Sequence, residues 1–330
     1  MPSFERESNR IVIAGASSLL GAELKSWLEE SRFAGWDLRL VDEEIAAGTL
    51  TEAGGEPAVI QPVEEGSFDR ARLVFFTGSP EFTKVNLQAA RAGGATVIDL
   101  SGGSIGEKET RLWHPRAEVE LEKDLNYAVP SAPGTVAIAL LDALSAVGLS
   151  RLGMIFFRPV SEAGRRGIEE LESQTAQLLS MQSTGQAVFD TQVAFGLLNR
   201  YGAASRENLS SIRERICAEV SPLTGKRGVF PSMQVVHAPV FYGYTFAALA
   251  ETASVTTRAK LAEVCQDAGF VIWKDADGPL GNLSAGDSTM HLELPEGNPS
   301  QPGAWWSWGA VDNFKLPAAN ALKLAEKLAA

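Results

Sequence analysis

The segment Gly15-Ala16-Ser17-Ser18-Leu19-Leu20-Gly21 has the residue types of a loop that holds a phosphate group. It follows the apolar run 10–14 and precedes apolar residues at helical spacing, so we predict that it joins a strand to a helix. Backbone N–H groups at the start of such a helix can bind a pyrophosphate. A serine replaces the middle glycine of the usual dinucleotide-binding pattern, and a tight turn without a ligand is the alternative.

Asp42 ends the second predicted strand, where a carboxylate can accept a hydrogen bond from a ribose 2′-hydroxyl. Asp42 therefore favours NAD over NADP. Glu43 and Glu44 add repulsion against a 2′-phosphate, although a solvated acidic turn explains these two residues equally well.

The elements that must position this loop alternate between strand and helix. Further strands are predicted over 38–41, 72–76 and 96–100, with a helix over 80–94. Most of these strands end in a loop of small residues, which is typical of a doubly wound parallel sheet of the Rossmann type.

The pattern changes after Pro130, where a second domain of the α+β class is predicted. Its later strands indicate a mostly antiparallel sheet with helices on one face. The predicted helices cover 136–147, 168–182, 257–268 and 316–330, the strands cover 152–160, 233–240 and 244–249, and 295–303 is predicted to be a loop.

Composition excludes several classes of function. The 330 residues carry a net charge of −12, and this surface would repel nucleic acids and anionic membranes. Cys217 and Cys265 are far apart and have no neighbouring histidine, so neither a disulfide framework nor a metal site is expected. With no apolar segment long enough for a signal peptide or a membrane span, we expect a cytoplasmic protein.

Several sequence blocks together resemble the aspartate-semialdehyde dehydrogenase family over nearly the whole chain. In chain order they are GASSLLG, VFFTGS, VIDLSGG, VSEAGRRGIEEL from Val160, QVAFGLLN from Gln192, HAPVFYGYT from His237 and AVDNFKLPAANALKLAE from Ala310. The resemblance implies a dinucleotide-binding domain over 1–129 that is completed by a C-terminal helix over 314–330. It also implies an α+β domain over 130–313 that carries catalysis and the interface of a homodimer.

Family members reductively dephosphorylate aspartyl phosphate with NADPH, so the resemblance implies NAD or NADP as cofactor. It places Gly15, Ser17, Gly21, Gly78, Ser161, Asn313 and Asn320 against the cofactor. The remaining loop residues Ser18, Leu19 and Leu20, together with Asp42, complete the predicted cofactor site. Glu162 stands where the family has glycine, and a carboxylate there requires a hydrogen-bond donor as partner.

The residues that the family uses for chemistry are replaced. Within 129–135, Ala132 occupies the position of the nucleophilic cysteine, and an alanine methyl group cannot form a thioester. Tyr244 replaces the general-base histidine, and His237 replaces the substrate-binding arginine. Arg158 replaces a glutamine, and Ile105 replaces a phosphate-binding arginine.

These replacements predict a degenerate member that keeps the fold and the dimer but has lost the usual dehydrogenase reaction. The alternative is an active NAD(P)-dependent oxidoreductase on another small molecule, which recruits Ser131, His237 or Tyr244. A third class is a non-catalytic regulatory or assembly partner. The cluster Trp305-Trp306-Ser307-Trp308 is either an interface anchor or a strand that packs on the core, and Cys217 and Cys265 are expected to be small buried hydrophobic residues.

Overall fold

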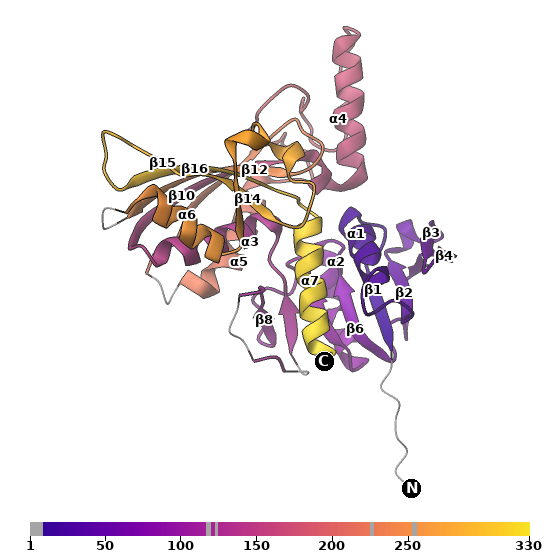
Figure 1. Cartoon of the computed structure of the whole chain (residues 1–330). Coiled ribbons are helices and arrows are strands. Elements are labelled where there is room, and N and C mark those ends of the chain that lie inside the picture. Colours follow the sequence, from indigo (N-terminus) through magenta and orange to yellow (C-terminus); the bar gives the residue numbers. More distant parts are fainter. Residues whose placement is uncertain (1–8, 117–119, 123–124, 225–227, 253–255) are drawn as a thin grey trace. The chain divides into compact units, whose positions relative to one another are not determined.

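The computed structural model describes residues 9–116, 120–122, 125–224, 228–252 and 256–330, which belong to two compact units (Figure 1). The first unit comprises Met1–Ser131 and Pro317–Ala330, and the second comprises Ala132–Leu316. Chain segments from both ends of the sequence therefore build the first unit.

The first unit is organised around a parallel sheet of seven strands in the order β5-β2-β1-β6-β7-β9-β8. The strands are β1 (Arg10–Ala14), β2 (Asp37–Asp42), β5 (Gln61–Pro62), β6 (Ala71–Phe76), β7 (Thr96–Asp99), β8 (Thr110–Leu112) and β9 (Asn126–Ala128). A separate hairpin consists of β3 (Leu50–Ala53) and β4 (Glu56–Val59), and a short 3-10 helix covers Glu44–Ala46.

Both faces of this sheet are buried because successive strand residues point to opposite sides. Ile11 and Ile13 of β1 pack in one cluster with residues of α1 (Leu19–Glu29) and α7 (Lys315–Leu328). Val12 and Ala14 pack in another cluster with residues of α2 (Pro80–Ala92). The structure thus confirms the predicted doubly wound parallel sheet.

The second unit contains a mixed sheet in the order β11-β10-β12-β16-β14-β13, with β15 paired to β16. The strands are β10 (Leu149–Arg158), β11 (Ser232–His237), β12 (Tyr244–Thr252), β13 (Phe270–Trp273), β14 (Met290–Glu293), β15 (Glu296–Gly297) and β16 (Ala304–Val311). The helices are α3 (Ala132–Ser145), α4 (Gly164–Leu179), α5 (Leu209–Thr224) and α6 (Arg258–Asp267), with short 3-10 turns over Val160–Ala163, Asp275–Asp277 and Asn282–Ser284.

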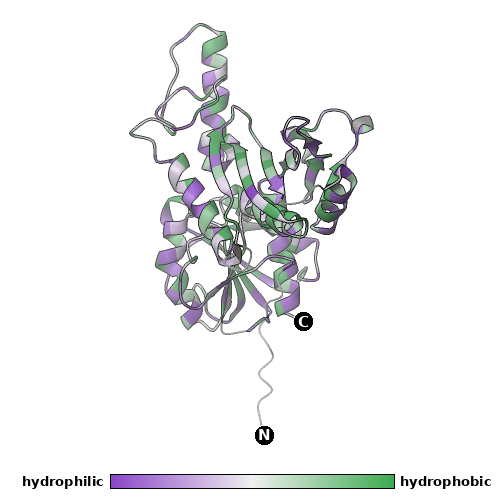
Figure 2. Ribbon diagram, turned by 90° about the vertical axis from the view of Figure 1, so that its left-hand side faces the viewer, coloured by the Kyte–Doolittle hydropathy of each residue, from purple (hydrophilic) through white to green (hydrophobic). Residues whose placement is uncertain are grey.

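Helices cover one face of the mixed sheet. On β10, Leu152, Met154 and Phe156 are buried on the face that α3 covers, whereas Ile155 on the other face is 38% exposed. Figure 2 shows hydrophilic and hydrophobic residues alternating along the helices, as expected for helices with one buried side. The predicted α+β class is confirmed.

Several predicted boundaries are wrong by a few residues; the helix predicted over 168–182, for example, covers Gly164–Leu179. The helix predicted over 136–147 begins at Ala132. Pro133 is tolerated in its first turn because the N–H group that proline lacks would have no intrahelical partner there. The segment 295–303, predicted to be a loop, contains the short strand β15, which pairs with Trp305 and Trp306 of β16.

Candidate functional site

The glycine-rich loop lies between β1 and α1, and most of its backbone donors are hydrogen-bonded within the protein, three of them to the end of β2. The N–H groups of Gly15 and Ala16 both bond to the Val41 carbonyl at 2.9 and 3.2 Å. Ser18 is the N-cap of α1: its Oγ accepts from the Gly21 N–H and donates to the Thr77 carbonyl, both at 2.9 Å. The loop is therefore a capped helix start held against the end of β6.

Asp42 also holds this loop. The carboxylate is 7% exposed, and its two oxygens accept hydrogen bonds from the backbone N–H groups of Ser17 at 2.7 Å and Glu43 at 2.8 Å. The predicted ribose acceptor thus already binds a loop amide. Each carboxylate oxygen can accept a second bond, so this contact leaves room for a ribose hydroxyl.

The structure brings together eight of the predicted cofactor residues in the first unit. They are Gly15, Ser17, Ser18, Leu19, Leu20, Gly21, Asp42 and Gly78. The first-turn N–H groups of Leu19 and Leu20 have no acceptor among the described residues. Asn320 of α7 is 2% exposed, and its Nδ2 is a buried donor with no partner in the described part of the chain. These unused donors fit a phosphate- and amide-bearing ligand.

Asn313 lies in the second unit and holds three segments together. Its Oδ1 accepts from the Gly243 N–H at 3.0 Å, and its Nδ2 donates to Ser161 Oγ and to Glu162 Oε1, both at 3.1 Å. Glu162 therefore has the donor partner that its carboxylate requires. The structure places Asn313 and Ser161 together, with their polar groups bonded to each other.

A row of buried polar side chains ends the mixed sheet on its helix-covered face. Arg158 of β10 and His237 of β11 are directly paired in the parallel register, and Tyr244 begins the neighbouring strand β12. The exposed fractions of Arg158, His237 and Tyr244 are 2%, 0% and 0%. Three of the five replaced family positions are thus neighbours. Of the other two, Ala132 is a buried residue at the start of α3, and Ile105 lies in a turn of the first unit that follows β7.

Hydrogen bonds fix the protonation of His237. Its Nε2 lies 3.3 Å from the Val193 carbonyl, which can only accept, so Nε2 carries the proton. Nδ1 of the neutral ring then accepts from the Tyr201 hydroxyl at 3.2 Å, while the Tyr201 oxygen accepts from Arg158 Nη1 at 3.1 Å. Burial and the Arg158 charge lower the pKa of His237 to about 4, although the hydrogen bond to Val193 by itself would raise it. Both ring nitrogens of His237 are therefore hydrogen-bonded.

The other titratable groups of this row, Arg158 and Tyr244, are also each held in one protonation state. Burial alone would lower the pKa of Arg158, but Tyr201 and Glu207 raise it, and Glu207 Oε2 lies 2.6 Å from Nη2. Burial and the Glu162 charge raise the pKa of Tyr244 well above its usual value. Within the described residues, Tyr244 Oη and Arg158 Nε have no hydrogen-bond partner.

Sequence reasoning missed Tyr201 and Glu207. Both lie between α4 and α5, in a segment without periodic pattern, and no local signal pointed to them. The segment is held by α4: Gln174 Oε1 accepts from the Val193 N–H at 2.7 Å, and Glu170 accepts from the Val188 N–H. These contacts bring Val193 and Tyr201 to His237.

We expect Glu207→Gln to destabilise the second unit by about 2 kcal/mol, because it leaves the buried Arg158 charge without its carboxylate. The estimate is at the low end for a buried pair since Glu207 itself is 27% exposed. Urea unfolding would measure the change. The matched control is Glu251→Gln, which breaks an exposed ion pair with Arg151 and should cost less than about 0.5 kcal/mol. Equal effects of the two substitutions would contradict the prediction.

The two cysteines lie apart from these groups. Cys265 of α6 is buried, and burial raises the pKa of its thiol to about 12. Cys217 of α5 is only partly buried, and burial raises the pKa of its thiol as well. No group of three or more His, Cys, Asp or Glu residues suited to a metal ion occurs in the described ranges. Searching those same ranges for a helix able to cross a bilayer found none.

Comparisons with known proteins agree with this architecture. Residues 139–279 match the family model of the semialdehyde dehydrogenase dimerisation domain. A USG-1 protein homolog from Pseudomonas aeruginosa is 30% identical over 96% of this chain and 97% of that protein. Aspartate-semialdehyde dehydrogenase 2 from Vibrio cholerae is 25% identical over the same shares.

Solved structures show the same fold. A probable aspartate-semialdehyde dehydrogenase from Pseudomonas aeruginosa superposes with a TM-score of 0.86 at 27% identity, over 97% of this chain and 98% of that chain. The class is thus that of two-domain proteins with a Rossmann-like α/β unit and a semialdehyde dehydrogenase dimerisation domain. Within it, the chain belongs to the aspartate-semialdehyde dehydrogenase family.

Proposed function

We propose that this chain is a dinucleotide-binding homodimer that does not catalyse the thiol-dependent reaction of its family. One observation carries the proposal: His237 Nε2 bonds to the Val193 carbonyl and its Nδ1 already accepts from the Tyr201 hydroxyl, while burial keeps the neighbouring Tyr244 hydroxyl protonated. Neither can take a proton from a nucleophile at neutral pH. By resemblance the nucleophile itself is absent, since Ala132 has only a methyl group.

The relatives indicate which reaction has been lost. Several are named aspartate-semialdehyde dehydrogenase, and one structure is that of the Vibrio cholerae enzyme complexed with ASA. Transferred to this chain, that chemistry requires a thiolate, a base and cations for an anionic substrate. Arg158 supplies a cation, but Glu207 already pairs with it. An active oxidoreductase on another substrate is the second hypothesis, and it would require His237 or Tyr244 to take part in chemistry despite these contacts.

Dinucleotide binding is supported by the donors that the first unit leaves unused. We infer that the N–H groups of Leu19 and Leu20 would hold phosphate oxygens and that Asn320 Nδ2 would donate to a polar group of the ligand. A bound nicotinamide dinucleotide would supply hydride transfer. One relative of the fold, from Candida albicans, was solved with NADP, at 14% identity and a TM-score of 0.68.

For this chain we propose NAD, because the Asp42 carboxylate lies at the loop and would repel a 2′-phosphate. Asp42→Asn should shift the ratio of NAD to NADP affinity toward NADP by about tenfold, since it removes this charge while keeping one oxygen for the Ser17 N–H. Calorimetric titrations of both dinucleotides would measure the ratio. Glu44→Gln, on the exposed turn nearby, is the control that should leave the ratio unchanged. Tighter NADP than NAD binding by the wild type would refute the assignment.

We propose that the homodimer forms through the face of the mixed sheet that the helices do not cover. The strand register places Ile155, Leu249 and Trp306 together on this face. Ile155 and Trp306 are 38% and 47% exposed. Charged substitutions at either, Ile155→Glu or Trp306→Glu, should convert the dimer to a monomer because they place a carboxylate in an apolar contact. Analytical ultracentrifugation would show this. Val85→Glu, at an apolar residue of α2 that is 79% exposed, should leave the dimer intact. A monomeric wild type would refute this part of the proposal.

A further inference from the structure

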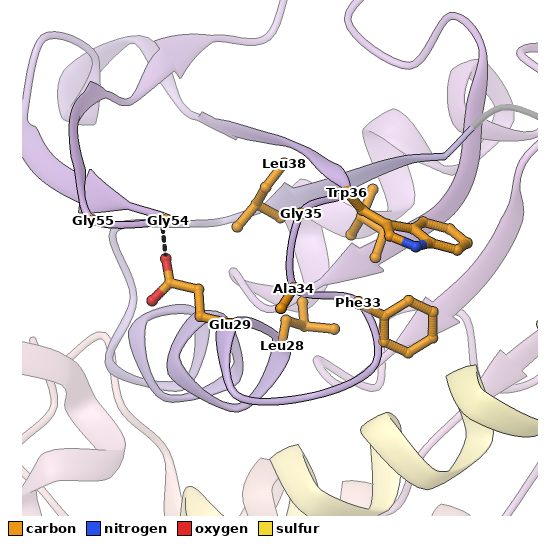
Figure 3. Close-up of a pocket in the computed structure, with 10 residues that line it drawn as sticks. Leu28, Glu29, Phe33, Ala34, Gly35, Trp36, Leu38, Gly54 and Gly55 are labelled. Atoms are coloured by element: carbon orange, nitrogen blue, oxygen red, sulfur yellow. Dashed lines mark hydrogen bonds between the residues drawn. The ribbon is translucent and has the colours of Figure 1, made fainter.

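We propose that the first unit binds a small apolar amine in a pocket at the end of α1 opposite to the glycine-rich loop (Figure 3). The pocket has a volume of about 360 Å³ and lies between the end of α1, the turn 33–36 and the turn of the β3–β4 hairpin. Ile11 and Leu38 line it near the amino ends of β1 and β2, whereas the glycine-rich loop follows the carboxyl end of β1. The pocket is therefore distinct from the proposed dinucleotide site.

The pocket has apolar walls and open space. Leu28 and Leu38 face it from α1 and β2, and Ala34 lies between them (Figure 3). Its rim includes Gly54 and Gly55, at φ of +61° and +80°, and a Cβ added to either would meet no atom within 4 Å. The size, and lining side chains that are apolar apart from Glu29 and the Trp36 indole N–H, are those of a site for a small organic molecule.

The turn that forms one wall is held rigidly. Phe33 is 3% exposed, and its ring packs edge-on against Trp36 with the centroids 4.9 Å apart. The backbone N–H of Trp36 donates to the Phe33 carbonyl at 2.9 Å, and the Arg72 guanidinium lies 5.6 Å from the centre of the Trp36 ring. The pocket is thus preformed on this side and needs no ordering of its wall when a ligand enters.

A single charge among the ten lining residues selects the ligand. Glu29 is the ionisable residue of the lining, and its Oε1 accepts from the Gly54 N–H at 2.9 Å. Its second oxygen has no partner among the described residues, so it can accept from a ligand ammonium group. Glu29 also ends α1, where the helix dipole favours a cation. Lys25 does not line the pocket, since its ammonium group donates to Thr51 Oγ1 at 3.3 Å and to the Glu52 carbonyl.

The complementary ligand is an apolar or aromatic body with one ammonium group. Isothermal titration calorimetry with phenethylamine, with the uncharged 2-phenylethanol and with anionic phenylacetate tests this on the full chain. We expect saturable binding of phenethylamine, weaker binding of the alcohol and none of phenylacetate. Absence of saturable phenethylamine binding, or equal binding of phenylacetate, would overturn the proposal.

Three variants locate the binding. Glu29→Gln should weaken phenethylamine binding by about fivefold without changing that of the alcohol, because the amide oxygen can still accept from Gly54 while the charge is lost. Glu30→Gln makes the same charge change at an exposed neighbour outside the pocket and should have no effect. Ala34→Trp should abolish binding of both ligands by filling the space. Binding that is unchanged in Ala34→Trp, or equally weakened in Glu30→Gln, would contradict the assignment. Circular dichroism would show that each variant is folded.

Discussion

Purified protein is expected to give no phosphate-dependent, NADP-linked oxidation of aspartate semialdehyde above a no-enzyme background, and Ala132→Cys alone should not restore it. The new thiol would have no base, because both nitrogens of His237 are bonded and burial keeps the Tyr244 hydroxyl protonated. Family chemistry of this kind needs the thiolate as well as the position of the sulfur. The measurement is the absorbance of NADPH with and without inorganic phosphate.

Thiol labelling provides the internal control for this experiment. Cys217 and Cys265 have raised pKa values, so both should react slowly with iodoacetamide in the wild type. Mass spectrometry of Ala132→Cys would show whether the added thiol becomes labelled or acylated. Turnover by the wild type, or an acyl adduct on any of its side chains, would contradict the proposed loss of activity.

The hypothesis of an oxidoreductase on another substrate predicts a different result. A substrate-dependent change in NADH or NADPH absorbance would have to disappear in Tyr244→Phe or His237→Ala. Because Tyr244 Oη has no hydrogen-bond partner among the described residues, Tyr244→Phe removes a hydroxyl without breaking a contact that the structure records. Loss of activity in that variant would therefore indicate a role in chemistry and not in folding.

Gly15→Ala should destabilise the first unit by about 3–5 kcal/mol. Gly15 has φ of +91°, where a side chain is strained, and a Cβ would overlap the backbone nitrogen of Gly78. Neither backbone can move freely, because the Gly15 N–H is bonded to Val41 and the Thr77 N–H to Ala14. A fall in midpoint temperature of about 10 °C would be expected in calorimetry.

Gly78→Ala is the matched control at the other side of this contact. Its Cβ would lie 3.1 Å from Cδ1 of Phe82, a side chain that can shift, so the cost should be only about 1 kcal/mol. If both substitutions cost the same, the close approach of the two loops is not what requires glycine at position 15. Loss of NAD binding in Gly78→Ala with little loss of stability would in turn support the dinucleotide site.

Sequence patterns predicted much of the first unit because its signals are local. Apolar runs such as 10–14 end at small-residue loops, and in a parallel sheet both faces of each strand are buried, so hydrophobicity alone marks them. For the same reason the glycine-rich loop was expected after the first strand and Asp42 at the end of the second, where the structure has them. The bond between the Asp42 carboxylate and the Ser17 N–H was not predictable, since it depends on the exact approach of β2 to the loop.

The sequence alone determined the fold class, the resemblance to a family and the residues that replace its chemistry. Only the tertiary structure shows what those residues contact. Arg158 and His237 became neighbours through strand pairing, and Tyr201 and Glu207 reached them from a loop that α4 holds in place. The pocket at Glu29 likewise depends on a hairpin turn that packs against α1. These contacts join residues distant in the chain, and hydrogen-bond direction and burial arise only when such residues meet, so no local pattern encodes them.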